Sequence, residues 1–287
     1  MRVLVTGAGG TLGREVVARL AADGRSVRAH DRAAMPEEVT DQADEVVVGD
    51  LRDSGHLAEA LSGVDAVVHA AALPSPKSAT EQEVFTNNVE SAYHVLDAAG
   101  RAGIGRIVYI SSLSAIGLAW ARREVSPERV PVTETHPYVG DDVYGLSKYV
   151  GELIAVTVSR RWATTMVSLR FPFLGTGERL QHHLARVHAD PAVERNALWG
   201  WLDTRDAARA VAAALTRPLA GHVVINVAAP DTTALVPTTE LLHRYHPTTR
   251  IDAPLDGFDV PFSTRLSHEL LDFTPIHAWR TTKDDTP

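Results

Sequence analysis

The chain opens with Arg2-Val-Leu-Val-Thr6, which leads into Gly7-Ala-Gly-Gly10-Thr-Leu-Gly13 and then into a run with helical periodicity from Arg14 to Ala22. A short β-branched run indicates a strand, and Asp23-Gly24 ends the helical pattern. Glycines between a strand and a helix let the backbone approach an anion at the helix N-terminus, where the partial charge is positive. Asp31, an acid about twenty residues further on, completes a dinucleotide-binding pattern, although glycines at this spacing also form plain turns.

The alternation of strands and helices continues along the chain. Strands are predicted where β-branched runs end at small or acidic residues, and helices where apolar residues recur every three or four positions. This alternation favours an α/β fold of the Rossmann type, with a doubly wound parallel sheet covered on both faces. The predicted strands are 26–30, 45–48, 65–72 with its loop, 106–110, 164–170 and 223–227, and the predicted helices are 54–61 with Ser54 as its N-cap, 80–102, 142–161, 180–188, 206–215 and 239–245.

We expect residues 1–175 to form the Rossmann domain, with residues 203–228 returning to it. Residues 176–202 and 229–287 are expected to form a small C-terminal lobe that binds substrate. Between Leu113 and Asp142 the chain carries three prolines, which block helix continuation. A loop of this length in a compact fold is usually functional.

Composition excludes several classes of protein. With 287 residues, 45% of them apolar, the chain is long enough for a large packed core. Its formal net charge of −8 provides no basic field for nucleic acid or for an anionic membrane surface. The absence of cysteine excludes disulfides and thiolate nucleophiles. The longest apolar run, Val64 to Leu73, is too short to span a membrane, and Met1 is followed almost at once by a strand, so we expect a cytoplasmic protein.

Asp31 lies at the tip of the second predicted strand, where a carboxylate can accept hydrogen bonds from an adenosine ribose and repels a 2′-phosphate. This favours NAD as the cofactor. Arg32 beside it can stack on adenine or pair with a 2′-phosphate, so NADP stays possible. Asp50 and Leu51 follow the third strand, near the expected adenine, although Gly49-Asp50 is also a common turn.

Tyr144 and Lys148 are four residues apart in a predicted helix, so their side chains share one face. A free phenol with a pKa of about 10 is a poor proton donor or acceptor at neutral pH. A neighbouring ammonium group favours the phenolate and is expected to lower the pKa of Tyr144. The alternative interpretation is an exposed helix pair with no chemical role.

The chain has 13 histidines, and three of them, His182, His183 and His188, lie close together. Their spacing matches no metal-binding motif, so we expect a solvated helix face and no metal site. Trp199 and Trp201 precede Asp203 and either line a pocket or belong to the core. The core interpretation is favoured for Trp199.

Seven short motifs occur in a fixed order: Thr6-Gly7-x-x-Gly10-x-x-Gly13, Gly49-Asp50-Leu51, His69-Ala-Ala-Ala72, Asn88-Val89, Ser111-Ser112, Tyr144-x-x-x-Lys148 and Leu169-Arg170-Phe-Pro. In this combination, up to about Ala229, the sequence resembles the extended short-chain dehydrogenase/reductases, the NAD-dependent epimerase/dehydratase family. The C-terminal portion matches that family only loosely.

The resemblance implies roles for individual residues. Tyr144 resembles the general acid/base, Lys148 the lysine that holds the nicotinamide ribose, and Ser112 the serine that orients the substrate oxygen. Ser111 and Ser114 are rivals for that role, and a purely structural serine cluster is the alternative interpretation. The implied cofactor-binding residues are Gly7, Gly10, Thr11, Leu12, Gly13, Asp31, Arg32, Asp50, Leu51, Ala70, Ala71, Asn88, Tyr144, Lys148 and Phe171. The implied substrate-binding residues are Ser75, Ser112, Ser114, Tyr144, Phe173 and Trp201. For Asn88 a helix-capping or core amide is an equally good interpretation.

These residues predict an NAD(P)-dependent oxidoreductase that transfers hydride between nicotinamide and a secondary alcohol or ketone of a sugar-like substrate. Two alternatives stay open: a nucleotide-sugar 4-epimerase that retains NAD, and a non-catalytic NAD(P)-binding sensor. Leu113 and Ser114 stand where related dehydratases carry an Asp-Glu pair, so dehydration is not expected. The resemblance also implies a homodimer formed through the helices at 80–102 and 142–161.

Overall fold

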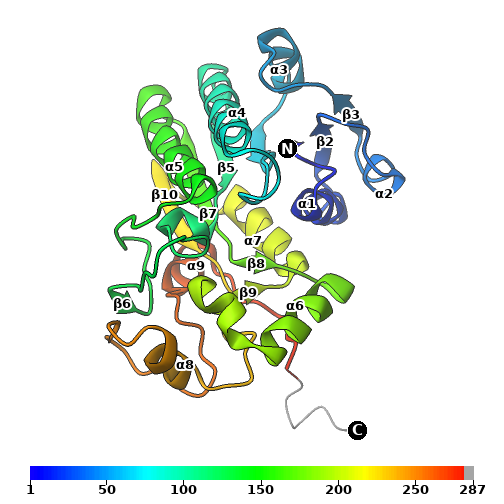
Figure 1. Ribbon diagram of the computed structural model, residues 1–287. Coiled ribbons are helices and arrows are strands. Elements are labelled where there is room, and N and C mark those ends of the chain that lie inside the picture. The colour runs from blue at the N-terminus through cyan, green and yellow to red at the C-terminus, as the bar shows by residue number, and fades with distance from the viewer. Residues whose placement is uncertain (281–287) are drawn as a thin grey trace, which may run out of the picture.

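The computed structural model describes residues 1–280 and has a seven-stranded parallel sheet at its centre (Figure 1). The strand order is β10-β7-β5-β4-β1-β2-β3, so the chain builds the sheet outward in both directions from β1 and β4. A ligand cleft is expected at this reversal point, at the carboxyl ends of the strands. The strands are β1 (Arg2–Thr6), β2 (Ser26–Asp31), β3 (Glu45–Val48), β4 (Ala66–His69), β5 (Arg106–Ile110), β7 (Thr165–Arg170) and β10 (His222–Asn226).

Helices cover both faces of the sheet, which confirms the predicted Rossmann-type fold (Figure 1). They are α1 (Thr11–Ala22), α2 (Glu37–Thr40), α3 (Ser54–Leu61), α4 (Glu81–Arg101), α5 (Val143–Trp162), α6 (Gly177–Ala189), α7 (Thr204–Thr216), α8 (Thr238–Tyr245) and α9 (Arg265–Leu271). Two 3₁₀ helices, η1 (Leu113–Ile116) and η2 (Pro191–Ala197), and the short strand pairs β6 (Arg129–Val130) with β11 (Arg250–Ile251) and β8 (Phe173–Leu174) with β9 (Trp201–Leu202) lie outside the main sheet.

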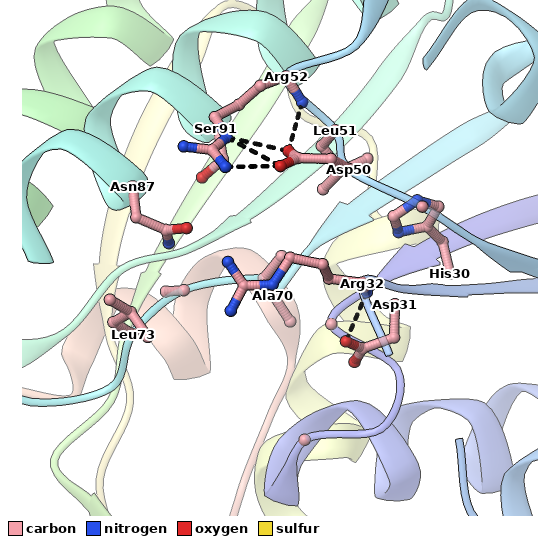
Figure 2. A pocket seen from close by; sticks show the side chains of 15 residues that line it. His30, Asp31, Arg32, Asp50, Leu51, Arg52, Ala70, Leu73, Asn87 and Ser91 are labelled. Atoms are coloured by element: carbon pink, nitrogen blue, oxygen red, sulfur yellow. Dashed lines mark hydrogen bonds and ion pairs between the residues drawn. The ribbon is translucent and has the colours of Figure 1, made fainter. Parts of the chain in front are cut away.

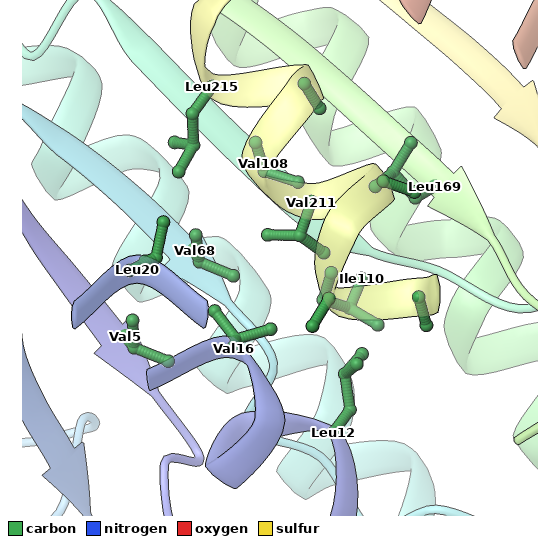
Figure 3. Packing of buried hydrophobic residues seen from close by; sticks show 14 of the residues in the cluster. Val5, Leu12, Val16, Leu20, Val68, Val108, Ile110, Leu169, Val211 and Leu215 are labelled. Carbon is green, nitrogen blue, oxygen red and sulfur yellow. The ribbon is translucent and has the colours of Figure 1, made fainter. Parts of the chain in front are cut away.

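Successive residues of each central strand point to opposite faces, and each face has its own apolar core. On one face, Val5 of β1 and Val108 of β5 pack against Val16 of α1 and Val211 of α7 (Figure 3). Full burial of one such side chain contributes about 1.5–3 kcal/mol relative to leaving it exposed. The two helices lie side by side over this face.

The opposite face of the sheet is covered by α3, α4 and α5. Leu4 and Ile107 point from the sheet into this second core, between Leu96 of α4 and Ala155 of α5. Helix α4 begins with a capping box, in which Thr80 accepts a hydrogen bond from the Glu83 N–H and the Glu83 carboxylate accepts one from the Thr80 N–H. This packing places α5, with Tyr144 and Lys148, against the carboxyl end of β5.

A third apolar cluster lies beyond the sheet and combines parts distant in sequence. Its members come from the segment 113–132, from the region of Leu198 and Trp199, and from residues 228–262. The long proline-bearing loop is therefore packed rather than loose, and β6 within it pairs with β11. The domain boundaries proposed above stay a prediction, and residues 281–287 of the predicted lobe lie outside the described part of the chain.

The predicted N-cap of α3 is wrong by one residue. Asp53, not Ser54, is the N-cap of α3, because the Asp53 carboxylate accepts from the Gly55 and His56 N–H groups at 2.8 and 3.1 Å. A carboxylate here also interacts favourably with the helix dipole.

Candidate functional site

The glycine loop between β1 and α1 leaves no room for side chains. Gly7 has a φ of +70°, and a Cβ atom there would lie 2.6 Å from the Ala71 nitrogen. A Cβ atom on Gly13 would lie 2.0 Å from the Gly7 carbonyl oxygen. Helix α1 begins after Gly10, which offers no side-chain cap, and its first turn has no acidic residue. The free N–H groups and the positive end of the dipole suit a pyrophosphate.

A cleft opens beside this loop, where the strand order reverses between β1 and β4 (Figure 2). Among the predicted cofactor residues, it is lined by Gly7, Gly10, Asp31, Arg32, Asp50, Leu51, Ala70 and Ala71. Sequence reasoning missed the other lining residues, which are His30, Gly49, Arg52, Ala72, Leu73, Asn87 and Ser91. The glycine cradle and the carboxylate at the tip of β2 fit a dinucleotide.

Asp31 connects the tip of β2 to the glycine loop. One of its oxygens accepts from the Gly9 N–H at 3.0 Å, and the other accepts from the Arg32 N–H at 2.7 Å. The carboxylate is thus fixed at the place where a ribose is expected. The Arg32 side chain extends across the cleft (Figure 2), and within residues 1–280 its guanidinium makes no ion pair.

Asp50 forms an ion pair with a residue that the sequence did not single out. Arg52 donates from Nη2 to the Asp50 carboxylate at 2.6 Å and from its backbone N–H at 2.9 Å (Figure 2). Hydrogen bonding to Arg52 lowers the pKa of Asp50 to about 2. The signal in the sequence was an arginine two residues after the acid, at the end of β3.

The Asn88 amide makes its hydrogen bonds to other residues of the protein. Its Oδ1 accepts from the Leu73 N–H at 2.7 Å, while its Nδ2 donates to the Leu73 carbonyl at 3.1 Å and to Ser147 Oγ at 3.2 Å. Asn88 is buried and does not line the cleft, whereas its neighbour Asn87 does. The structure therefore places Asn88 as a clamp on the loop after β4, and a direct contact with the cofactor stays a prediction.

Tyr144, Lys148 and Ser112 come together at the carboxyl end of β5. Lys148 donates from Nζ to the Ile110 carbonyl at 2.9 Å, and its Nζ lies 5.9 Å from the centroid of the Tyr144 ring. Ser112, which is half-buried, precedes η1 and accepts from the Ser114 N–H at 3.1 Å. The Ser112 hydroxyl donates to the Phe171 carbonyl at 3.4 Å, and it lies near enough to the phenol of Tyr144 to lower the pKa of that phenol.

Burial changes the acidity of this group in a way that the sequence did not predict. Burial raises the pKa of Tyr144 to about 12, and the nearby Ser112 hydroxyl opposes this only in part. The prediction that Lys148 lowers the pKa of Tyr144 is therefore wrong for the protein without a ligand. Burial also lowers the pKa of Lys148 to about 8, against the attraction of Glu152.

Several predicted site residues are not open to the cleft. Trp201 is buried, and its indole N–H donates to Asp231 at 2.9 Å. Leu12 and Phe171 pack in the core between the sheet, α1 and α7, and Ser114 is buried in η1. Among the remaining predicted residues, Thr11 is exposed at the start of α1, Ser75 hydrogen-bonds Ser78, Phe173 is half-buried, and Trp199 is fully buried as expected.

The expected solvated face of α6 is also corrected at His183. This side chain is buried and stacks on Phe173, with ring centroids 3.8 Å apart. Burial lowers the pKa of His183 to about 4. In the described part of the chain, no three His, Asp or Glu side chains are grouped so that they could hold a metal ion. None of the helices in residues 1–280 combines the length and the apolarity that crossing a membrane requires.

The chain is similar to known sugar dehydrogenases. It is 31% identical to the L-arabinose 1-dehydrogenase (NAD(P)(+)) of Haloferax volcanii over 78% of this chain and 87% of that protein. It is 29% identical to the uronate dehydrogenase of Pseudomonas syringae pv. tomato over 78% of this chain and 73% of that one.

The fold is also similar to that of a solved structure. A short-chain dehydrogenase/reductase superfamily protein from Agrobacterium tumefaciens with bound NAD superposes with a TM-score of 0.73 at 28% identity, covering 97% of this chain and 93% of that one. Residues 3–228 match the family model described as the NAD dependent epimerase/dehydratase family. Since that match covers most of the sequence, the chain belongs to this family, within the extended short-chain dehydrogenase/reductase superfamily.

Proposed function

We propose that this protein is an NAD(P)-dependent dehydrogenase that acts on a hydroxyl-bearing carbon of a sugar or a sugar acid. The observation that carries the proposal is the grouping of Tyr144, Lys148 and Ser112 at the carboxyl end of β5. The sugar dehydrogenases among its relatives support the substrate class.

Different residues bind different parts of the cofactor in this proposal. The glycine loop receives the pyrophosphate at the start of α1, and Asp31 receives the adenosine ribose. When bound, NAD(P) supplies the acceptor or donor of the hydride. Lys148, held by the Ile110 carbonyl, places a positive charge beside the phenol of Tyr144.

The proton chemistry is assigned to Tyr144. In the direction of reduction, its phenol donates a proton to the substrate oxygen, and in the direction of oxidation it takes one back. The Ser112 hydroxyl hydrogen-bonds the same oxygen and stabilises the charge that develops on it. Burial raises the pKa of Tyr144 to about 12, so the phenol carries the proton that reduction needs at neutral pH, but a pKa this high also makes it a weaker acid.

The test is direct. Purified protein is mixed with NAD or NADP and a panel of aldoses, uronic acids and sugar phosphates, and absorbance is followed at the reduced-nicotinamide band. We expect turnover that requires added cofactor and that Tyr144→Phe lowers by about 10²- to 10⁴-fold. Turnover of a nucleotide sugar without added cofactor, with NAD retained through purification, would instead identify a 4-epimerase. Equal rates in the wild type and in Tyr144→Phe would leave a sensor role.

We also propose that two copies of the chain associate through α4 and α5. These helices present an apolar groove lined by Tyr93, Val150, Leu153, Ile154, Thr157 and Val158. Tyr93 and Leu153 are each 47% exposed in the single chain. Grouped apolar side chains of this kind mark interaction sites on soluble proteins.

A further inference from the structure

A buried ion pair lies behind the catalytic residues and joins α5 to the end of β7. Arg170 donates to Glu152 from Nε at 2.8 Å and from Nη2 at 2.7 Å. The two side chains are only 5% and 6% exposed. Burying two charges is costly, and a well-packed apolar pair of similar volume is often at least as stable. Stability alone therefore does not account for this pair.

The pair is connected to the strand end that carries Ser112. Ser111 donates from Oγ to Glu152 Oε1 at 2.5 Å. Lys148, one helical turn before Glu152, donates from Nζ to the Ile110 carbonyl at 2.9 Å. Two side chains of α5 thus hold two consecutive residues at the end of β5, and Ser112 is the next residue in the chain.

Arg170 extends the network toward the long loop. Its Nη1 donates to the Glu134 carbonyl at 3.2 Å, and the Glu134 carboxylate accepts from the Asn226 N–H at 3.0 Å. The network therefore connects α5, β5, β7 and β10 with the loop that follows η1. Its charged side chains Glu134, Glu152 and Arg170 exchange no proton with the substrate in the chemistry described above, although Glu152 also attracts the ammonium group of Lys148.

We infer that Glu152 is a positioning residue, which acts through Ser111 to fix the end of β5 that carries Ser112. The Ser112 hydroxyl then keeps its place beside the phenol of Tyr144. This inference rests on the proposed function, because it concerns how that site is held. It predicts that loss of the bond between Ser111 and Glu152 slows turnover and leaves the binding of cofactor and substrate intact.

The first test is Ser111→Ala, which removes this hydrogen bond and leaves the ion pair in place. We expect kcat to fall by about 10- to 100-fold, because small misplacements of a reacting group have effects of this size. KM and the NADH dissociation constant should not change. The matched control is Ser159→Ala on α5, the helix that carries Glu152. This variant also loses a buried hydroxyl, which donates to the Thr164 carbonyl at 2.7 Å. It should keep the wild-type kcat.

A second pair of variants separates positioning from stability. Glu152→Gln leaves Arg170 buried with no carboxylate partner, so both Tm and kcat should fall. The double variant Glu152→Met, Arg170→Met removes both charges and should recover Tm but not kcat. A kcat that returns together with Tm would overturn the inference. If Glu152→Gln does not fold, Ser111→Ala and the double variant still decide between the two outcomes.

A measurement without turnover completes the test. We expect amide hydrogen exchange at Leu113, whose N–H donates to the Phe171 carbonyl at 2.9 Å, to be faster in Ser111→Ala than in the wild type and in Ser159→Ala. This result, combined with an absence of sugar dehydrogenation by the wild type, would reject the proposed function and support the positioning. Unchanged exchange together with unchanged kcat in Ser111→Ala would reject the positioning itself.

Discussion

The backbone N–H of Gly9 donates to the carboxylate of Asp31 at 3.0 Å, which connects the glycine loop directly to the tip of β2. The same carboxylate is expected to bind the adenosine ribose and to repel a 2′-phosphate, while Arg32 beside it attracts one. We therefore expect two adjacent residues of opposite charge, Asp31 and Arg32, to set the preference between NAD and NADP.

We predict that the wild type binds NADH more tightly than NADPH. Asp31→Ala should weaken NADH binding by about 10-fold or more, because hydrogen bonds to a charged group are lost. The NADH and NADPH dissociation constants should therefore become more similar. Arg32→Ala should weaken NADPH binding alone. Dissociation constants are measured by nicotinamide fluorescence, with Asp53→Ala, the N-cap of α3, as a control outside the cleft. An unchanged ratio in Asp31→Ala would contradict the assignment.

We predict that Gly13→Ala strongly reduces both the stability of the protein and its binding of NADH. The added Cβ would lie 2.0 Å from the Gly7 carbonyl oxygen, so the glycine loop must move. We expect a loss of about 1–3 kcal/mol in the free energy of unfolding and loss of NADH binding. Gly105→Ala is the control, because a Cβ there meets nothing within 4 Å. The two variants are compared by urea denaturation and by NADH titration, and similar behaviour of both would count against the predicted cradle.

The pH dependence of turnover should follow Lys148. Burial lowers the pKa of Lys148 to about 8, so its charge is present below that pH and lost above it. Reduction also needs the protonated phenol, and the pKa of Tyr144, raised to about 12 by burial, keeps it protonated well beyond that point. We therefore expect kcat/KM for reduction to fall as the pH rises through about 8. Lys148→Arg keeps its positive charge above pH 8, so its kcat/KM should not fall in that range. A wild-type kcat/KM that does not change as the pH rises through about 8 would contradict the role of Lys148.

Three buried histidines should make the fold sensitive to acid. Burial lowers the pKa of His30 and of His183 to about 4 and that of His69 to about 3, from 6.5. Below pH 6.5 the unfolded chain therefore binds more protons, and the free energy of unfolding falls as the pH drops toward 4, by up to about 1.4 kcal/mol per pH unit for each histidine. Urea denaturation along this range measures the slope. His183→Gln should reduce it, whereas the exposed His243→Gln should leave it unchanged.

The association of two chains predicts a further result. Leu153→Glu places a charge in the apolar groove between α4 and α5 and should give a monomer, whereas the wild type should have the mass of a dimer in sedimentation experiments. Val193→Glu, which changes a residue of η2 that is 45% exposed, should leave the dimer intact. A wild-type mass equal to one chain would reject this interface.

The sheet could be predicted closely from the sequence because its strands are β-branched runs with clear ends. The predicted strands at 45–48 and 106–110 have the observed bounds of β3 and β5. The four-residue helix α2 and the two-residue strand β6 were not predicted, since neither segment shows a clear periodicity. The strand β6 depends on its pairing with β11, more than a hundred residues away.

Residues of the candidate site could be predicted where their spacing in the sequence places them together. They could not be predicted where the grouping depends on contacts with other parts of the fold. Tyr144 and Lys148 share a helix face, so four residues of spacing sufficed. Arg52 stands two residues after Asp50, but this spacing alone does not predict the ion pair that the two side chains form. The acidity of Tyr144 depends on burial beneath the segment after β5, which no local pattern reports.

The third apolar cluster has a consequence for how the protein can change. It joins the segment that follows Ser112 to the chain beyond Leu198, and it is separate from the two cores that pack against the sheet. Substitutions in this cluster therefore change the surroundings of Ser112 without touching the core beneath the glycine loop. Under the proposed function, we expect substrate preference to be altered there while the affinity for the dinucleotide is kept.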